Sequence, residues 1–276
     1  MTYRAIVVHM DGSEANARRL ATAVRLARAY HAELIGVYLV AEPNITPFTA
    51  AVMPGAERAL QDEYDLERAV ERAFRDACTG AGIESIDWRS PAGDPYRAAA
   101  AQTRGADLAI LAQPAGDAGS TFSAGLAHAV LMESGRPVLF VPSASAVTTL
   151  GQRALIAWND SREAARAVAD ALPLLKDARS VHAVAVTATS EETLDEQVSD
   201  SELSAFLVRH AVATRVERIG GNNLDAGEVL LSHAADLGAD LIVMGGYSRP
   251  RIRELVWGGV TRTMLEKMTV PVLMAH

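Results

Sequence analysis

The sequence predicts an α/β fold in which a mostly parallel sheet carries helices on both of its faces. Short apolar runs with the pattern of strands alternate with amphipathic stretches of helical period along the chain. The same order of elements occurs twice, which indicates an internal duplication. The length of 276 residues and the hydrophobic content of 49% also favour two domains over one.

The first half opens with an apolar strand over residues 4–10, RAIVVHM, which runs into the turn Asp11-Gly12-Ser13. An alanine-rich amphipathic helix follows to about Tyr30. Ser13 is its expected N-cap, because a serine hydroxyl can accept a hydrogen bond from the first turn of a helix. The later expected elements are a strand over 34–40, a surface loop over 43–55, a charged helix over 56–79, a strand near 84–89, a helix that Gly93-Asp94-Pro95 opens, a strand over 107–112, a helix over 123–133 and a strand over 137–141.

The second half repeats this order in a shorter form. The turn Asn159-Asp160-Ser161 follows the repeated first strand, and Asn159 stands 148 residues after Asp11. Gly227 is expected to correspond to Gly93. The other expected elements are strands over 154–158, 181–186, 238–244 and 271–275, a charged helix over 194–210 and a helix from about 258. Polar residues 144–151 are the expected linker between a first domain over 1–143 and a second over 152–276.

Composition excludes several classes of partner. A formal net charge of -8 disfavours nucleic acid and anionic membranes. The apolar runs are too short to span a bilayer, and the N-terminus lacks the layout of a signal peptide, so a cytoplasmic location is expected. The single cysteine, Cys78, allows no internal disulfide, and its place in a helical pattern predicts a packed thiol.

Several motifs together resemble one known family. The DGS turn, the segment GADLIVMG over 238–245, the glycine loop before a helix and the final PVLM resemble a tandem universal stress protein. The resemblance implies two five-stranded, doubly wound, Rossmann-like domains of the adenine nucleotide alpha hydrolase-like type. It also implies a regulatory role in the stress response, with ATP bound by some members. By the same resemblance, the apolar last strands are expected to pair about a pseudo-twofold axis within one chain. Self-association of two chains into a homodimer is a further hypothesis.

The second half carries most of the family's phosphate loop, G-x-x-G-x₉-G-[ST]. Gly245 and Gly258 match its first and third glycines, whereas Ser248 stands at the second glycine and Gly259 at the hydroxyl position. A serine in a left-handed backbone costs about 1–2 kcal/mol, and a lost neutral hydrogen bond about 0.5–1.5 kcal/mol. These changes predict ATP binding weakened by about one to two orders of magnitude. Positive charge that could offset the loss comes from Arg249, Arg251, Arg253 and Arg262, with Glu254 opposing it.

The alternative for these arginines is a solvated or interdomain surface. At the base end, the resemblance places Asp11 and Leu39 in the first half, and Asn159 and Val186 in the second. Asparagine keeps an acceptor oxygen and loses the charge, while local turn chemistry could explain either residue. The first-half loop over 112–125 holds Gly116, Gly119 and Gly125, but also Asp117 and no basic residue, so this half is not expected to bind ATP. The predicted cofactor-binding residues are Asn159, Val186, Met244, Gly245, Ser248, Arg249, Gly258, Gly259 and Val260.

Catalytic and metal motifs are absent from the sequence. It contains no G-x-x-x-x-G-K-[ST] loop, and the spacing of its seven histidines matches no metal motif. We therefore expect no enzyme, no metal and no catalytic residues, with at most slow ATP hydrolysis. The expected function is a stress-response regulator that binds ATP in its second domain only. The alternative is a nucleotide-independent interaction scaffold or a sensor of a small metabolite.

Overall fold

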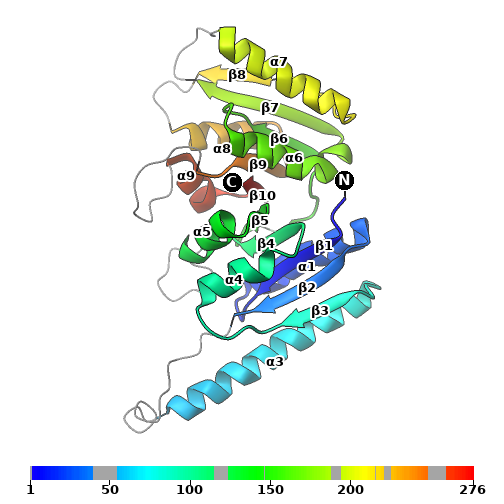
Figure 1. Ribbon diagram of the computed structural model, residues 1–276, viewed down its shortest axis with the longest axis vertical. Coiled ribbons are helices and arrows are strands. Elements are labelled where there is room, and N and C mark those ends of the chain that lie inside the picture. The colour runs from blue at the N-terminus through cyan, green and yellow to red at the C-terminus, as the bar shows by residue number, and fades with distance from the viewer. Residues whose placement is uncertain are drawn as a thin grey trace.

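The computed structural model describes residues 2–39, 55–114, 124–145, 147–187, 194–214, 216–220, 225–247 and 259–276. Strands and helices alternate through both halves (Figure 1). The first half contains β1 (Ala5–Met10), α1 (Ala15–Tyr30), β2 (Glu33–Tyr38), α3 (Ala56–Gly80), β3 (Ile86–Arg89), α4 (Pro95–Thr103), β4 (Leu108–Ala112), α5 (Ala124–Glu133) and β5 (Val138–Val141). The second half contains β6 (Arg153–Ala157), α6 (Arg162–Lys176), β7 (Ser180–Thr187), α7 (Leu194–Arg209), β8 (Val216–Gly220), α8 (Ala226–Asp236), β9 (Leu241–Gly245), α9 (Gly259–Lys267) and β10 (Val272–Ala275).

One sheet of ten strands runs through both halves in the order β3-β2-β1-β4-β5-β10-β9-β6-β7-β8. Each set of five strands is parallel, and the two sets meet where β5 pairs antiparallel with β10. Leu139 lies opposite Leu273, which is its own counterpart in the repeat, 134 residues later. A residue that faces its own counterpart is what a twofold relation requires. The predicted fold class and the pairing of the last strands are therefore confirmed.

Two hydrophobic cores cover the two faces of this sheet. Side chains alternate along a strand, so Ile6 and Val8 of β1 face one core while Val7 faces the other. The first core contains apolar side chains of α1, α3, α6 and α7, and the second contains those of α4, α5, α8 and α9. Because both faces are covered, all five residues of β4, LAILA, are buried.

The observed N-termini of the helices show that two expectations were wrong. Ser13 is not the N-cap of α1; that position belongs to Glu14, and the Ser13 hydroxyl instead donates to Asp11 Oδ1 over 2.7 Å. Gly93 and Gly227 are not equivalent, because Gly93 precedes its helix with a φ of 105° whereas Gly227 lies within the first turn of α8. The equivalent residues are the two aspartate N-caps, Asp94 and Asp225. The repeat is therefore shifted by a few residues at this point.

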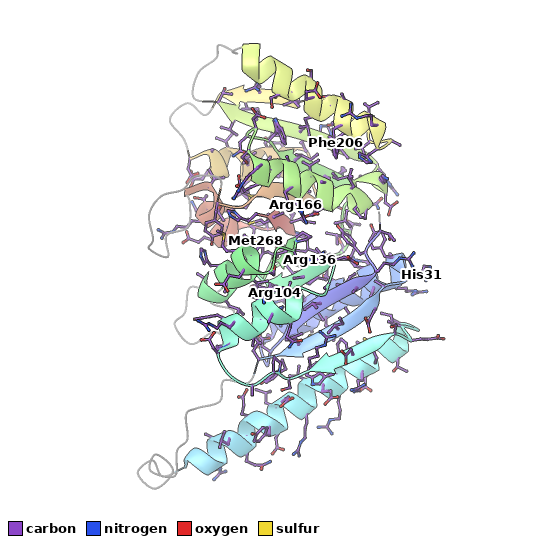
Figure 2. All side chains as sticks on the ribbon, viewed as in Figure 1. His31, Arg104, Arg136, Arg166, Phe206 and Met268 are labelled. Atoms are coloured by element: carbon purple, nitrogen blue, oxygen red, sulfur yellow. The ribbon has the colours of Figure 1, made fainter. Side chains whose placement is uncertain are left out.

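Other expectations agree with the structure. Cys78 is buried in α3, and burial raises the pKa of its thiol to about 11, as expected of a packed and unreactive cysteine. Figure 2 shows Arg104 and Arg136 at the ends of α4 and α5, where Arg136 Nε donates to the Arg104 carbonyl over 3.0 Å. In the part of the chain described, no helix is both long and apolar enough to cross a membrane. Of the predicted loop over 43–55, all but Gly55 lies outside the described residues.

Candidate functional site

The candidate site is a pocket at the carboxyl ends of the second-half strands. The chain passes from β6 to β7 on one side and returns to β9 on the other, so the strand order reverses between β6 and β9. Ligands of open α/β sheets bind at such a reversal. The pocket has a volume of about 100 Å³ and is lined by Ala157, Trp158, Asn159, Val184, Val186, Ala226, Leu230, Met244, Gly245, Val260 and Thr261.

The corner after β6 is held by hydrogen bonds from two helices. Ser161 is the N-cap of α6; its Oγ accepts from Ala164 N over 3.1 Å and donates to Asn159 Oδ1 over 2.8 Å. Asp160 has a φ of 54°, and its Oδ1 accepts from the Ser199 hydroxyl of α7 over 2.6 Å. The indole of Trp158 donates to that same hydroxyl over 3.2 Å. These contacts fix the corner and leave Asn159 exposed beside the pocket.

Gly245 marks the closest approach between β9 and α6. A Cβ at this position would lie 2.6 Å from the backbone nitrogen of Ala164 and 2.8 Å from the carbonyl carbon of Glu163. Backbone atoms cannot yield as a flexible side chain can, so only glycine fits without a shift. The sequence attributed this glycine to phosphate binding, and close packing against α6 is a sufficient reason for it.

The chain beyond Gly245 is anchored on the first half. A Cβ at Gly246 would lie 2.7 Å from Cδ2 of Leu131 in α5. Tyr247 follows with a φ of 59°, and its ring packs perpendicular to the ring of His128 at a centroid distance of 4.9 Å. His276 Nδ1 donates to the Gly246 carbonyl over 3.1 Å. Burial raises the pKa of Tyr247. Burial lowers the pKa of His128, and the Glu133 carboxylate opposes this second shift. The entrance to the phosphate loop thus lies against the other half of the molecule.

Helix α9 brings a hydroxyl to the pocket. Gly259 is the first residue of α9, and a Cβ there would meet nothing within 4 Å. Two residues later, Thr261 is buried and lines the pocket, and its Oγ1 accepts from Tyr247 N over 3.4 Å. The sequence assigned the missing hydroxyl to Gly259 and overlooked Thr261. A threonine in the first turn of the helix after the loop was the signal that could have identified it.

The predicted site residues separate into three groups. Asn159, Val186, Met244, Gly245 and Val260 line one pocket, although they come from the corner after β6, from β7 and β9, and from α9. Gly259 is exposed at the start of α9 and is not among the residues that line it. Binding at any of these residues stays a prediction. The predicted residues that lie outside the described parts of the chain are Ser248, Arg249 and Gly258, together with Arg251 and Arg253.

Arg262 does not extend toward the pocket. Its Nε lies 2.7 Å from Glu266 Oε1, one turn further along α9, and both side chains are largely exposed. The hydrogen bond from Arg262 to Glu266 raises the pKa of Arg262. The sequence analysis counted Glu254 as the opposing acid and missed Glu266, which lies at the i,i+4 spacing of a helical ion pair. For this arginine, the solvated surface is the correct interpretation.

The equivalent corner of the first half is closed by a buried ion pair. Asp11 Oδ1 lies 2.9 Å from Nη2 of Arg19, whose side chain has no exposed surface. Asp11 Oδ1 also accepts from the Ser13 backbone over 3.1 Å, and Asn16 accepts from Arg19 over 2.8 Å. The resemblance placed Asp11 at the base of a nucleotide, whereas the structure engages it in packing α1 onto the sheet. Gly116, Asp117 and Gly119 lie outside the described residues.

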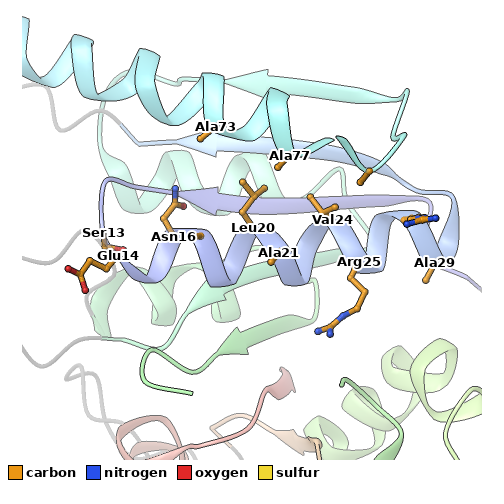
Figure 3. Close-up of a pocket in the computed structure, with 13 residues that line it drawn as sticks. Ser13, Glu14, Asn16, Leu20, Ala21, Val24, Arg25, Ala29, Ala73 and Ala77 are labelled. Atoms are coloured by element: carbon orange, nitrogen blue, oxygen red, sulfur yellow. The ribbon is translucent and has the colours of Figure 1, made fainter. Parts of the chain in front are cut away.

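A larger groove begins beside the first-half corner, where Ser13 and Asn16 line it. It runs between α1 and α3, is lined largely by alanine and has a volume of about 1040 Å³ (Figure 3). None of the nine predicted residues lines it. We place the candidate site at the smaller pocket because that pocket stands at the strand reversal and combines polar and apolar side chains. Within the described ranges, no group of three or more His, Cys, Asp or Glu side chains could hold a metal ion.

Comparisons with known proteins agree with this architecture. The universal stress protein family model matches residues 2–142 and again residues 151–276. A search of curated protein sequences finds no match. Among solved structures, a universal stress protein from Archaeoglobus fulgidus DSM 4304 is similar, with 18% identity, a TM-score of 0.75, and coverage of 98% of this chain and 95% of that one.

Two proteins from Pseudomonas aeruginosa have the same arrangement over the same length. One, from strain UCBPP-PA14, has a TM-score of 0.60, and the other, from strain PAO1, has a TM-score of 0.58. Each is 16% identical to this chain, and each alignment covers 98% of this chain and 92% of the other. At this level of identity, the likeness establishes a shared fold.

Proposed function

Because the chain belongs to the universal stress protein family, we propose that it is a stress-response regulatory protein that binds ATP in its second half only. The observation that carries the proposal is the different state of two equivalent corners. Asn159 is exposed beside a pocket, whereas Asp11 is buried against Arg19. A residue that is already paired in the interior is not free to recognise a base, so the first-half corner is unsuited to this role.

The lining of the second-half pocket suits the base end of a nucleotide. Apolar side chains such as Val186 and Met244 can cover the faces of a flat ring, while Asn159 supplies an amide and Thr261 a hydroxyl for its polar edge. The volume of about 100 Å³ is well below the roughly 300–1,000 Å³ of typical ligand pockets. The described residues therefore account for one end of a nucleotide site, and the phosphates would be held by residues 248–258.

We propose binding without rapid hydrolysis. The described lining residues include no carboxylate, imidazole or amine. A general base must stand within hydrogen-bond reach of the water that it activates. Asn159 and Thr261 can orient a ligand, but neither residue can accept a proton at neutral pH.

Equilibrium dialysis of the full chain with labelled ATP tests the proposal. Saturable binding at one site per chain is expected, and Asn159→Leu is expected to weaken it about tenfold or more, because a polar group of the ligand would lose its partner in a desolvated site. Thr261→Val removes one hydroxyl at nearly constant volume and is expected to weaken binding less. The matched control is Arg166→Gln, in the second turn of α6 and outside the pocket. This variant should leave the affinity for ATP unchanged.

Two outcomes would contradict the proposal. If the wild-type chain binds no ATP at millimolar concentration, the nucleotide-independent scaffold is favoured instead. If ATP binds but Asn159→Leu and Arg166→Gln have the same affinity as the wild type, the site lies elsewhere. Self-association is a separate question: β5 and β10 already cover each other within one chain, so these two strands are not available to join two copies.

A further inference from the structure

A second polar groove lies between the two halves, at the opposite end of the sheet from the candidate nucleotide pocket. Its volume is about 650 Å³. Arg153 begins β6, Ser180 begins β7 and Asp240 directly precedes β9, so the groove stands at the amino ends of the second-half strands. The ends of α1 and α6 form its remaining walls, together with the segment 148–152, which leads from one half into the other. None of the residues predicted for nucleotide binding lines this groove.

Three arginines line this groove, in a chain whose net charge is -8. Arg153 and Arg179 are exposed, and no carboxylate of the described residues lies within ion-pair distance of either guanidinium. In water such positions are tolerated, but two unpaired guanidinium groups beside a concave surface attract an anion. The planar fork of arginine suits a phosphate group, which it can bind through two parallel hydrogen bonds.

Arg25 fixes the wall of the groove. Figure 3 shows its side chain extending from α1 on the side away from Ala73 and Ala77. Its Nη1 donates to the carbonyl oxygens of Val147 and Thr148, over 3.1 and 2.9 Å. Its Nε and Nη2 are buried and, within the described residues, have no hydrogen-bond partner. Burial lowers the pKa of Arg25, and the Asp240 carboxylate opposes that shift, so the positive charge is retained beneath the groove.

The groove also contains hydrogen-bond acceptors. Asp240 Oδ1 accepts from Arg153 N over 2.9 Å, while Asp240 Oδ2 is buried and has no partner among the described residues. Asp177 accepts from the Tyr30 hydroxyl over 3.2 Å. Three guanidinium groups against two carboxylates leave a net charge of about +1 in this groove. Such a mixed lining favours a ligand that carries both an anionic group and hydroxyl donors over a bare anion.

The ends of α1 and α6 both reach this groove but contribute different side chains. The part of α6 that corresponds to the end of α1 reads ALPLLK and contains no arginine. The ring of Tyr30, which lines the groove, packs against the ring of Tyr3 at a centroid distance of 5.2 Å, and the Tyr3 hydroxyl donates to the Asp170 carbonyl over 2.8 Å. The positive charge of the groove therefore does not come equally from the two copies of the repeat.

We propose that this groove binds a small phosphate ester that carries hydroxyl groups, of the sugar phosphate class. The guanidinium groups of Arg153 and Arg179 contact the phosphate, Arg25 contributes its charge from the wall, and the acid Asp240 accepts from a hydroxyl of the ligand. The site is independent of the ATP site proposed above, because the two lie at opposite ends of the strands.

Isothermal titration calorimetry on the full chain, with ribose 5-phosphate as the probe, tests the proposal. We expect saturable binding that is tighter than that of inorganic phosphate, and none with ribose. Arg153→Gln and Arg179→Gln should each raise the Kd about tenfold or more, because each removes charge-assisted hydrogen bonds. Asp240→Asn should reduce the difference in affinity between ribose 5-phosphate and inorganic phosphate, because it removes a negative charge and an acceptor.

Two controls locate the binding. Arg28→Gln removes one positive charge, as Arg153→Gln and Arg179→Gln do. Arg28 lies in α1, the helix of Arg25, but outside the groove, so this variant should leave the Kd unchanged. Asn159→Leu alters the nucleotide pocket and should also have no effect. No saturable heat up to about 10 mM probe, which corresponds to less than about 3 kcal/mol of binding, would overturn the proposal. So would an effect of Arg28→Gln as large as that of Arg153→Gln, or loss of binding in Asn159→Leu.

Discussion

Replacing Asp11 by alanine should destabilise the molecule far more than the same change at its counterpart Asn159. Asp11 balances the guanidinium of Arg19, which is wholly buried, across 2.9 Å. Removing one member of such a pair leaves an uncompensated charge in the interior, which costs about 3–5 kcal/mol. Asn159 is exposed and gives up a hydrogen bond from the Ser161 hydroxyl, so its loss should cost about 1 kcal/mol or less.

Differential scanning calorimetry of the full chain measures this difference. At about 2–4 °C per kcal/mol for a chain of this size class, Asp11→Ala should lower the Tm by roughly 6–20 °C, and Asn159→Ala by about 4 °C or less. The double variant Asp11→Leu with Arg19→Met should recover much of the loss, since apolar side chains of similar volume can replace a buried ion pair. Equal shifts in the two alanine variants, or a double variant no more stable than Asp11→Ala, would refute the reasoning.

Three further predictions concern packing, pH and the contact between the halves. Gly245→Ala should lower stability by about 1–3 kcal/mol through overpacking against the α6 backbone, whereas Gly259→Ala should be neutral or stabilising by up to about 1 kcal/mol; equal urea midpoints would contradict this. Burial, with Arg19 nearby, lowers the pKa of His9 to about 3, so the unfolded chain takes up the proton first. Stability from His9 is then complete above pH 6.5 and falls by about 1.4 kcal/mol per pH unit toward pH 3. Urea unfolding of His9→Gln between pH 4 and 7 should lack that contribution, and identical pH profiles would exclude it. If ATP binds as proposed, His128→Ala should weaken ATP binding about two- to tenfold, because it removes the aromatic contact with Tyr247. His128→Phe keeps an aromatic ring and should not weaken binding. Equal affinities of the two variants for ATP in dialysis would rule out a role for this contact.

The neutral state of His9 follows from its hydrogen bonds. Thr103 Oγ1 donates to the Ala99 carbonyl over 2.9 Å, so it can only accept from His9 Nε2 at 3.2 Å. The Nε2 atom therefore carries the proton, and Nδ1 is a lone-pair acceptor that has no partner in the described structure. Burial and the nearby Arg19 charge lower the pKa of His9, and a protonated ring would in addition bury a second donor without a partner in the described structure.

The elements of the fold were predictable because each rests on a local pattern. Apolar runs, N-cap residues such as Asp94 and the recurrence of PVLFV as PVLMA are visible in the chain itself. The convergence of Asn159, Val186 and Met244 on one pocket was also accessible, since each stands at or near the carboxyl end of a strand whose place in the order follows from the repeat. Their use in binding stays a prediction.

Errors arose where the repeat was applied residue by residue. Gly227 was aligned with Gly93 by its place in the repeat, although one lies inside a helix and the other before it. Ser13 was expected to be an N-cap from its residue type, but of the serines in the two turns it is Ser161 that caps its helix. Duplicated elements keep their order while their ends move, and helix ends are set by hydrogen bonds that a sequence offset does not record.

The sequence by itself determined the duplication, the α/β alternation and the resemblance to the family, because these depend on periodic burial and on motifs read along the chain. The pairing of the last strands was an implication of that resemblance. Only the tertiary structure decided which equivalent residues kept equivalent roles. Asp11 forms a buried ion pair with Arg19, and Tyr247 packs against His128 of the other half. Gly245 lies so close to the backbone of α6 that a Cβ would not fit there. Each of these depends on distances between atoms of separate elements, and those distances are fixed when the two cores pack on the sheet.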